Sequence, residues 1–116
     1  MWQSVEYAAF WVGPESDKYR LSVFGFTGDT GDALAAPVHV ARISKGMQFS
    51  CVDQDNDNCF AHCAAESKGG WWLNCCSRSI LNTDGAACWN VATDVYVLDV
   101  IFSRMLVKLD PLQLID

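Results

Sequence analysis

Six cysteines crowd into one stretch of this chain and limit what it can fold into. They stand at positions 51, 59, 63, 75, 76 and 88, while the first 50 residues and the last 28 contain none. Such clustering in a chain of 116 residues indicates either disulfide bonds or a metal site. No C-x2-C pair is present, and adjacent cysteines are poorly placed to bind one zinc ion, so disulfides are favoured. The alternative is a zinc site formed by Cys59, His62, Cys63 and Cys76.

The size and charge of the chain fit one small domain and exclude some partners. Eight basic and fourteen acidic residues give a net charge of -6, and several acids gather between Asp53 and Asp57. Nucleic acid is therefore excluded as a partner, because phosphate binding needs a basic surface. No apolar stretch reaches the roughly 18 residues of a membrane span. The first residues lack the basic region of a signal peptide. For a disulfide-rich domain this suggests a fragment, a trimmed mature chain or an incomplete gene model.

The first 26 residues carry the pattern of a β-hairpin. Val5, Tyr7 and Ala9 alternate with other residues and are expected on one side of a strand. A second β-prone run covers residues 19–26, and the intervening stretch at 13–17 is rich in turn-forming residues. These features predict two antiparallel strands joined by a turn.

Shorter elements are expected along the rest of the chain. Asp32 is placed to cap a short helix over residues 32–35, and residues 47–50 form an extended piece that leads into the acidic run. Residues 64–67 are expected to form one helical turn, which Gly69 and Gly70 end. Two further strands are predicted over residues 95–102 and 105–109.

The acidic run at residues 53–57 is a candidate calcium loop. In a curled loop, the carboxylates of Asp55 and Asp57 can converge on one ion together with backbone carbonyls a little further on. An EF-hand is excluded, because the positions that need Gly and Glu hold Asn58 and Ala64. A solvated acidic turn without any ion is the alternative.

Several short strings of residues, in order and spacing, resemble the fibrinogen C-terminal-related domain of fibrinogen, ficolins and tachylectins. They cover roughly residues 5–83, and residues 105–109 resemble the last strand of that domain more loosely. The strings are Tyr19-Arg20-Leu21-Ser22-Val23, Gly28-Asp29-x-Gly31-Asp32, Met47-x-Phe49-Ser50, Asp53-x-Asp55-Asn56-Asp57, Cys63-Ala64, Gly70-Trp71-Trp72-x-Asn74-x-Cys76 and Leu81-Asn82.

The resemblance implies an α+β fold, fibrinogen C-terminal-like, with short antiparallel strands and long irregular loops stabilised by calcium and disulfides. The family domain is about twice as long, so residues 1–116 are expected to form a single partial domain. Residues 1–50 would be a remnant of its central sheet subdomain, and residues 51–116 its calcium- and ligand-binding subdomain.

The resemblance also implies a metal site and a disulfide. Calcium, the expected cofactor, would be bound by the side chains of Asp55 and Asp57 and by the backbone carbonyls of Cys59 and Ala61. Cys63 and Cys76 would form the family disulfide, and the peptide bond between Cys75 and Cys76 would be cis. The other four cysteines allow three pairings, of which Cys59 with Cys75 and Cys51 with Cys88 is preferred; an interchain disulfide is the rival use.

The ligand pocket of the family lies beside that cis bond. It accepts acetylated sugars in ficolins and tachylectins and a peptide amino terminus in fibrinogen. Here Ser77 replaces a common histidine, and Ser67 replaces an aromatic or acidic residue, whereas Trp71 and Trp72 are expected in the core. The predicted ligand-binding residues are Ser67, Cys75, Cys76 and Ser77, with Trp89 as an exposed aromatic contact.

Two functions remain open from the sequence. The first is a secreted, calcium-stabilised, lectin-like module that binds acetylated carbohydrate or a related small group, and family analogy suggests innate immunity as its context. The second is a structural protein that assembles as a homo-oligomer and carries a vestigial sugar pocket. Catalytic motifs such as G-x-S-x-G and H-E-x-x-H are absent from the sequence, so an enzyme is not expected.

Overall fold

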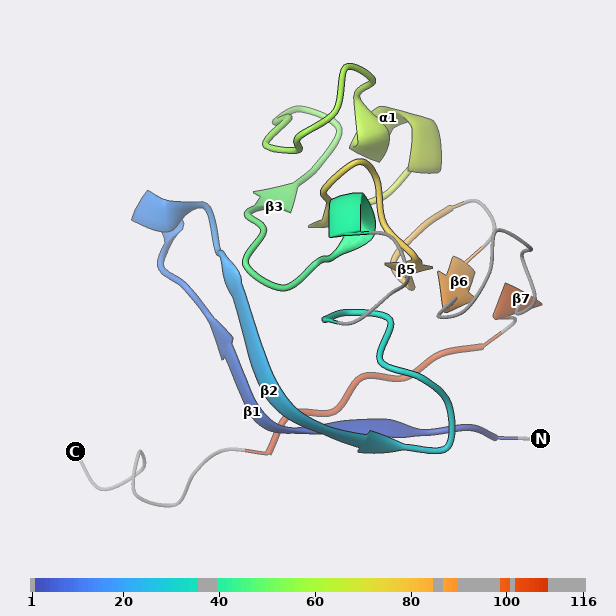
Figure 1. Ribbon diagram of the computed structural model, residues 1–116. Helices are drawn as coiled ribbons and strands as arrows, with labels where there is room; N and C mark the ends of the chain where they lie inside the picture. The colour runs from blue at the N-terminus through green and yellow to red at the C-terminus, as the bar shows by residue number, and fades with distance from the viewer. Residues whose placement is uncertain (1, 36–39, 85–86, 90–98, 101, 109–116) are drawn as a thin grey trace.

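A long, bent hairpin forms one side of the molecule, and short strands joined by irregular loops lie against its inner side (Figure 1). The computed structural model describes residues 2–35, 40–84, 87–89, 99–100 and 102–108. Every strand pair of the described chain is antiparallel. This arrangement has the short antiparallel strands and irregular loops that the sequence predicted.

The predicted hairpin is confirmed. Strand β1 (Val5–Val12) pairs with strand β2 (Leu21–Gly28), with Val12 opposite Leu21 near the turn and Val5 opposite Gly28 at the far end. The turn contains a short 3-10 helix, η1 (Glu15–Asp17), where the sequence is rich in turn-forming residues. Two strands alone are marginal in water, so this hairpin depends on what packs against it.

One expectation for the first strand is wrong beyond its midpoint. Val5 and Tyr7 are partly buried as expected, but Ala9 is exposed and Phe10 and Val12 are the partly buried residues after it. The cause lies opposite Ala8, where Gly25 has a φ of +73°, a left-handed conformation that bends the strand. The bend moves the inward face from odd to even positions and wraps the hairpin around the core.

Replacing Gly25 with alanine is expected to destabilise the fold by about 2 to 3 kcal/mol, since the new methyl group adds strain at positive φ and a clash. A Cβ atom there would lie 2.7 Å from the Cβ of Ala8. Gly46→Ala is the matched control. Gly46 has a φ of +83°, and no atom of the described residues lies within 4 Å of the place that a methyl group would take, so only the backbone strain applies.

Urea denaturation of the two variants measures the difference. Gly46→Ala should cost about 1 kcal/mol, and adding Ala8→Gly to the Gly25→Ala protein should recover the extra loss. Equal costs for the two alanine variants would contradict the proposed clash.

The rest of the chain forms small elements around the end of the hairpin. Strand β3 pairs with β4, and β5, β6 and β7 form a three-stranded sheet. The element bounds are η2 (Val40–Arg42), β3 (Phe49–Ser50), α1 (Cys63–Ser67), β4 (Trp71–Trp72), β5 (Ser79–Ile80), β6 (Ala87–Trp89) and β7 (Asp99–Val100). The extended piece predicted at residues 47–50 therefore contains β3, and the helical turn predicted at residues 64–67 is α1.

The helix predicted at residues 32–35 is a turn instead. The capping bond does form, since Asp32 Oδ1 accepts the Ala35 N–H at 3.0 Å, but the same oxygen also accepts the hydroxyl of Tyr7 in β1. Burial and this hydrogen bond hold the pKa of Tyr7 well above its ordinary value. Asp32 thus ties a turn to the hairpin rather than starting a helix.

Two other boundary predictions are corrected. Helix α1 ends at Ser67, and its C-cap is Lys68, in a left-handed conformation with φ 58°, and not Gly69 or Gly70. Residues 105–108 form no strand, because no described strand edge is hydrogen-bonded to them and their side chains are exposed. Of the strand predicted at residues 95–102, β7 is described; residues 95–98 and 101 and the end at 109 lie outside the described residues.

The core is centred on the adjacent tryptophans of β4. Trp71 is 2% exposed and Trp72 is 8% exposed, which confirms them as core residues. The Trp72 ring packs edge-on against Phe49, with centroids 5.3 Å apart, and its indole N–H donates to the carbonyl of Tyr19 at 2.8 Å. Trp72 therefore joins the hairpin connection to strand β3.

Candidate calcium and ligand site

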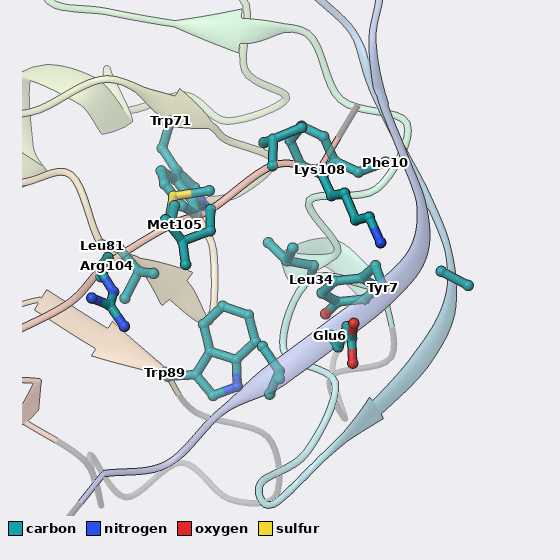
Figure 2. Close-up of a pocket in the computed structure, with 14 residues that line it drawn as sticks. Glu6, Tyr7, Phe10, Leu34, Trp71, Leu81, Trp89, Arg104, Met105 and Lys108 are labelled. Atoms are coloured by element: carbon teal, nitrogen blue, oxygen red, sulfur yellow. The ribbon is translucent and has the colours of Figure 1, made fainter. Parts of the chain in front are cut away.

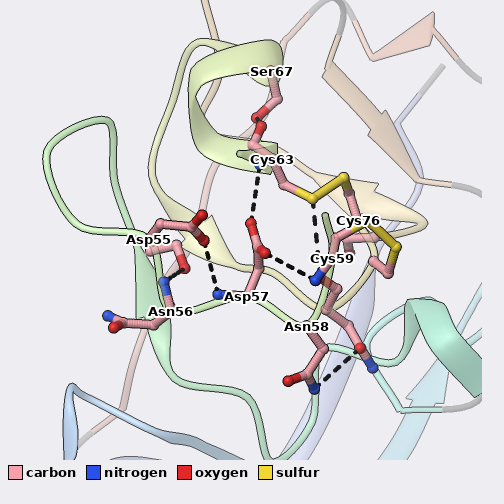
Figure 3. The surroundings of a disulfide bond; sticks show 12 residues. Asp55, Asn56, Asp57, Asn58, Cys59, Cys63, Ser67 and Cys76 are labelled. Atoms are coloured by element: carbon pink, nitrogen blue, oxygen red, sulfur yellow. Dashed lines mark hydrogen bonds between the residues drawn. A yellow bond between two sulfur atoms is a disulfide. The ribbon is translucent and has the colours of Figure 1, made fainter. Parts of the chain in front are cut away.

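One carboxylate organises the acidic loop. Asp57 Oδ1 accepts the N–H of Cys59 and Oδ2 accepts the N–H of Cys63, both at 3.0 Å (Figure 3). Cys63 is the first residue of α1, so Asp57 satisfies a backbone donor that the helix start leaves open. Asp57 thereby fixes the start of this helix relative to the loop.

The neighbouring asparagine anchors the same loop to the sheet. The N–H of Asn56 donates to Ser50 Oγ at 2.9 Å, and its side-chain amide donates to the carbonyl of Phe49 at 2.8 Å. Both partners belong to β3. The acidic loop is therefore held at one end by a strand and at the other by a helix.

Two disulfides join α1 and the preceding loop to the segment after β4. Cys63 is bonded to Cys76 and Cys59 to Cys75, as predicted, and the peptide bond between Cys75 and Cys76 is cis, also as predicted. Because the bonded sulfurs are no longer thiolates, the zinc alternative at Cys59, Cys63 and Cys76 is wrong.

The predicted bond between Cys51 and Cys88 is not formed. Cys51 is a free thiol that donates to Asp53 Oδ1 at 2.9 Å, and the Cys88 thiol donates to the carbonyl of Arg78. The hydrogen bond to Asp53 raises the pKa of the Cys51 thiol, which keeps it in its less reactive protonated form. Pairing by elimination failed here because it assumed that all six cysteines are bonded.

The carboxylates of the acidic loop are close enough to share one ion. Ligand atoms of Asp55, Asp57 and His62 lie within 4.8 Å of one another. Calcium binds oxygen at 2.3–2.6 Å, so two oxygens on one ion can be up to about 5 Å apart. Asp55 uses Oδ1 to accept the N–H of Asp57 at 3.2 Å and has a second oxygen available. The two carboxylates therefore fit calcium, which binds oxygen, whereas the imidazole nitrogen of His62 is not a ligand of this kind.

His62 completes the wall of this cluster. Its Nε2 lies 2.8 Å from the carbonyl of Val52, whereas its Nδ1 is buried and has no hydrogen-bond partner within the part of the chain that the structure describes. The carbonyls of Cys59 and Ala61 remain predicted ligands.

The other residues predicted to bind a ligand are Ser67, in helix α1, and three consecutive residues at and beside the disulfides. Ser67 lies one helical turn after Cys63 and its hydroxyl donates to the Cys63 carbonyl at 2.8 Å (Figure 3). Cys75, Cys76 and Ser77 are all half-buried, and the Ser77 hydroxyl donates to the carbonyl of Ser79 at 2.9 Å. Their ligand remains a prediction.

The exposure expected for the Trp89 side chain is wrong. Trp89 is 8% exposed, and its indole N–H donates to the carbonyl of Gly31 at 2.8 Å. Its position in β6 turns it toward the core, which its neighbourhood in the sequence did not reveal. Ser44 was not predicted to lie at this site. Its hydroxyl is 2.8 Å from that of Ser77, which is 33 residues away in the sequence, so no local pattern could have indicated the contact.

Comparison with known proteins assigns the family. The family described as "Fibrinogen beta and gamma chains, C-terminal globular domain" matches residues 2–97. The chain belongs to this family. The fibrinogen-like fold class predicted from the sequence is thereby confirmed.

Individual relatives cover much more of this chain than this chain covers of them. Protein scabrous of Drosophila melanogaster is 37% identical over 106 residues, which are 89% of this chain and 12% of that protein. The fibrinogen gamma chain of Mus musculus is 45% identical over 87 residues, which are 68% of this chain and 20% of that protein. The fibrinogen-like chain thus spans a fifth or less of these curated relatives.

Solved structures agree with the fold. The fibrinogen-like globe domain of human ANGPTL6 superimposes with a TM-score of 0.62 at 35% identity, over 73% of this chain and 34% of that one. A lamprey fibrin D-dimer complexed with the peptide Gly-His-Arg-Pro-amide superimposes with a TM-score of 0.66 at 29% identity, over 86% and 34% of the two chains. Within the described ranges, no helix has the length and apolar character that crossing a membrane requires.

Proposed function

We propose that this fibrinogen-like chain is a secreted, calcium-stabilised recognition module and not an enzyme. The observation that carries the proposal is the position of Asp57, whose carboxylate lies in a cluster suited to calcium and also holds the start of α1. Calcium bound there would stiffen the loop whose cysteines are bonded to the cis Cys75-Cys76 pair. The two disulfides agree with an oxidising, extracellular setting.

The proposed ligand site lies beside the Cys75-Cys76 pair and suits a ligand that donates a hydrogen bond. The hydroxyl proton of Ser67 is already used on the Cys63 carbonyl, so its oxygen is left as an acceptor for a ligand N–H. Both the acetamido group of an acetylated sugar and the ammonium group of a peptide amino terminus supply such a donor. The lamprey fibrin structure, which holds the peptide Gly-His-Arg-Pro-amide, makes the second ligand a direct comparison.

A calcium titration combined with ligand binding tests this proposal. At a calcium concentration 100 times its dissociation constant, binding would stabilise the folded, oxidised chain by about 2.7 kcal/mol and so raise its melting temperature. Asp55→Asn should abolish the rise, whereas Asp84→Asn, an exposed aspartate outside the cluster, should leave it unchanged. No rise in the unaltered chain would refute the calcium site.

Two matched probe pairs then separate the ligand classes. N-acetylglucosamine is compared with glucosamine, and Gly-His-Arg-Pro-amide with its N-acetylated form, each with calcium and with chelator. Binding of the acetylated sugar alone supports a lectin; binding of the free peptide alone supports amino-terminus recognition. If a folded chain binds neither pair, recognition at this site is excluded.

An assembly role is the second candidate, and one surface favours it. On the outer face of the hairpin, Trp11 is 64% exposed and Phe24 is 57% exposed. Large exposed aromatic side chains on one strand pair are typical of a contact surface. The test is the oligomeric state of the chain at high concentration without either ligand. A monomer would argue against assembly, whereas a stable oligomer that Trp11→Ser disrupts would support it.

A further inference from the structure

A cavity of about 530 Å³ lies between strand β1 and the C-terminal segment at residues 104–108 (Figure 2). Its apolar wall combines the hairpin, the core tryptophans and neighbouring leucines. The main apolar and aromatic lining residues are Tyr7, Phe10, Leu34, Trp71, Leu81 and Trp89. Of the residues predicted to bind calcium or ligand, Trp89 alone is among those lining it, so this cavity differs from the site proposed above.

The segment at residues 104–108 forms a wall that is free to adjust. Its side chains are exposed, and none of these five residues makes a hydrogen bond to another described residue. Arg104, Met105 and Lys108 nevertheless face the same space as β1. A loosely attached wall over a preformed apolar floor gives a small molecule a route of entry.

An unpartnered donor marks the floor of this cavity. Trp71 is 2% exposed, and its indole N–H has no hydrogen-bond partner among the described residues. The other two core indoles are satisfied, by the carbonyls of Tyr19 and Gly31. Buried indole N–H groups normally find an acceptor, and Figure 2 shows the Trp71 ring projecting from β4 into the region of the cavity. Because the indole nitrogen has almost no solvent-accessible surface, a ligand oxygen can accept this N–H only after neighbouring side chains of the cavity wall move aside.

The charged groups around the cavity favour an anion. Arg104 and Lys108 line it together with a single acid, Glu6, and none of the three forms an ion pair within the described residues. A further acid, Asp32, is reached through its bond to Tyr7. In Figure 2, Arg104 lies at the opposite end from Glu6, so the end near Arg104 is the more positive one.

We propose that this cavity binds an apolar organic anion, whose hydrophobic body lies between Trp71 and Trp89 and whose anionic oxygen accepts the N–H of Trp71 near Arg104. Ligand pockets of this kind combine a mostly apolar wall with a few polar groups that fix orientation. The ligand would satisfy the buried indole donor and offset the local positive charge. This site is independent of calcium and of the cis Cys75-Cys76 pair.

Two fluorescent probes with similar aromatic bodies test the proposal. 8-Anilino-1-naphthalenesulfonate carries one anionic group, and N-phenyl-1-naphthylamine carries none. The folded chain should bind one equivalent of the sulfonate and bind the neutral probe more weakly. In Trp71→Phe, which keeps the aromatic wall but removes the N–H, the dissociation constant of the sulfonate should rise about tenfold, while that of the neutral probe changes less than about twofold.

A surface variant keeps the test decisive if Trp71→Phe is unstable. Arg104→Gln changes an exposed side chain and should weaken sulfonate binding roughly threefold, without affecting the neutral probe. Trp11→Phe, which alters an exposed indole outside the cavity, is the control and should change neither. The proposal would be overturned if both probes bound equally well to all variants. It would also be overturned if Trp11→Phe lost binding, or if the chain formed a dimer that excluded both probes.

Discussion

Replacing Asp57 with alanine is expected to lower the free energy of unfolding by about 3 kcal/mol in calcium-free buffer, because its carboxylate holds two backbone N–H groups. Each hydrogen bond to a charged acceptor contributes roughly 1.5 to 3 kcal/mol when it is protected from water, and this carboxylate is half-buried. In a domain of this size, the melting temperature should fall by roughly 10 to 15 °C.

Chelator is essential to the measurement, since it separates the hydrogen bonds of Asp57 from any bound calcium. Asp55→Ala is the matched control: this neighbouring carboxylate is exposed and accepts one backbone N–H. It should cost less than half as much in chelator, while both variants should lose any stabilisation by calcium. If the two variants are equally stable without calcium, Asp57 has no special role in holding the loop to α1.

Removing both disulfides is expected to cost about 5 kcal/mol, which is much of the stability of an ordinary domain. The two bridges close loops that overlap over most of their length, with sequence separations of 16 and 13. When one bridge remains, the other closes only a short additional loop, so each alone should contribute about 2 kcal/mol. The two losses together should therefore exceed their sum.

The two bridges should also differ from each other. Cys63 is completely buried in the core, whereas Cys59 is half-buried, so the Cys63→Ala/Cys76→Ala pair leaves a cavity that the Cys59→Ala/Cys75→Ala pair does not. Urea denaturation in a Cys51→Ser/Cys88→Ser background, which removes the two cysteines outside these bridges, measures all three combinations. A Cys59–Cys75 deletion that costs more than the Cys63–Cys76 deletion would contradict this ranking.

Local patterns predicted the parts of the fold that local physics decides. The alternation in residues 5–26 was enough for the hairpin, and turn-forming residues located its loop. The bend was missed, because a strand glycine indicates neither the sign of its φ nor the residue opposite it, which here is Ala8. Residues 105–108 show the opposite limit: β-prone residues form a strand only where an edge accepts their hydrogen bonds.

The candidate site also has a part that the sequence predicted and a part that it did not. The acidic spacing and the family disulfide were available from the sequence, and the structure brings Asp55 and Asp57 together beside Cys63. The sequence did not predict that Trp89 is buried or that Cys51 stays a thiol, since both depend on chain segments far away in sequence. The contact between Ser44 and Ser77 depends on tertiary packing alone.

The overlapping loops closed by the two disulfides have a consequence for cleavage by proteases. Lys68 is exposed and lies between Cys63 and Cys75, inside both closed loops. A peptide bond cut at that position would leave two pieces that are still joined covalently twice. Extracellular fluids contain enzymes that cut after lysine at exposed loop tips. The acidic loop and the segment after β4 would stay attached through such a cut, so a nicked molecule would keep both halves of the site.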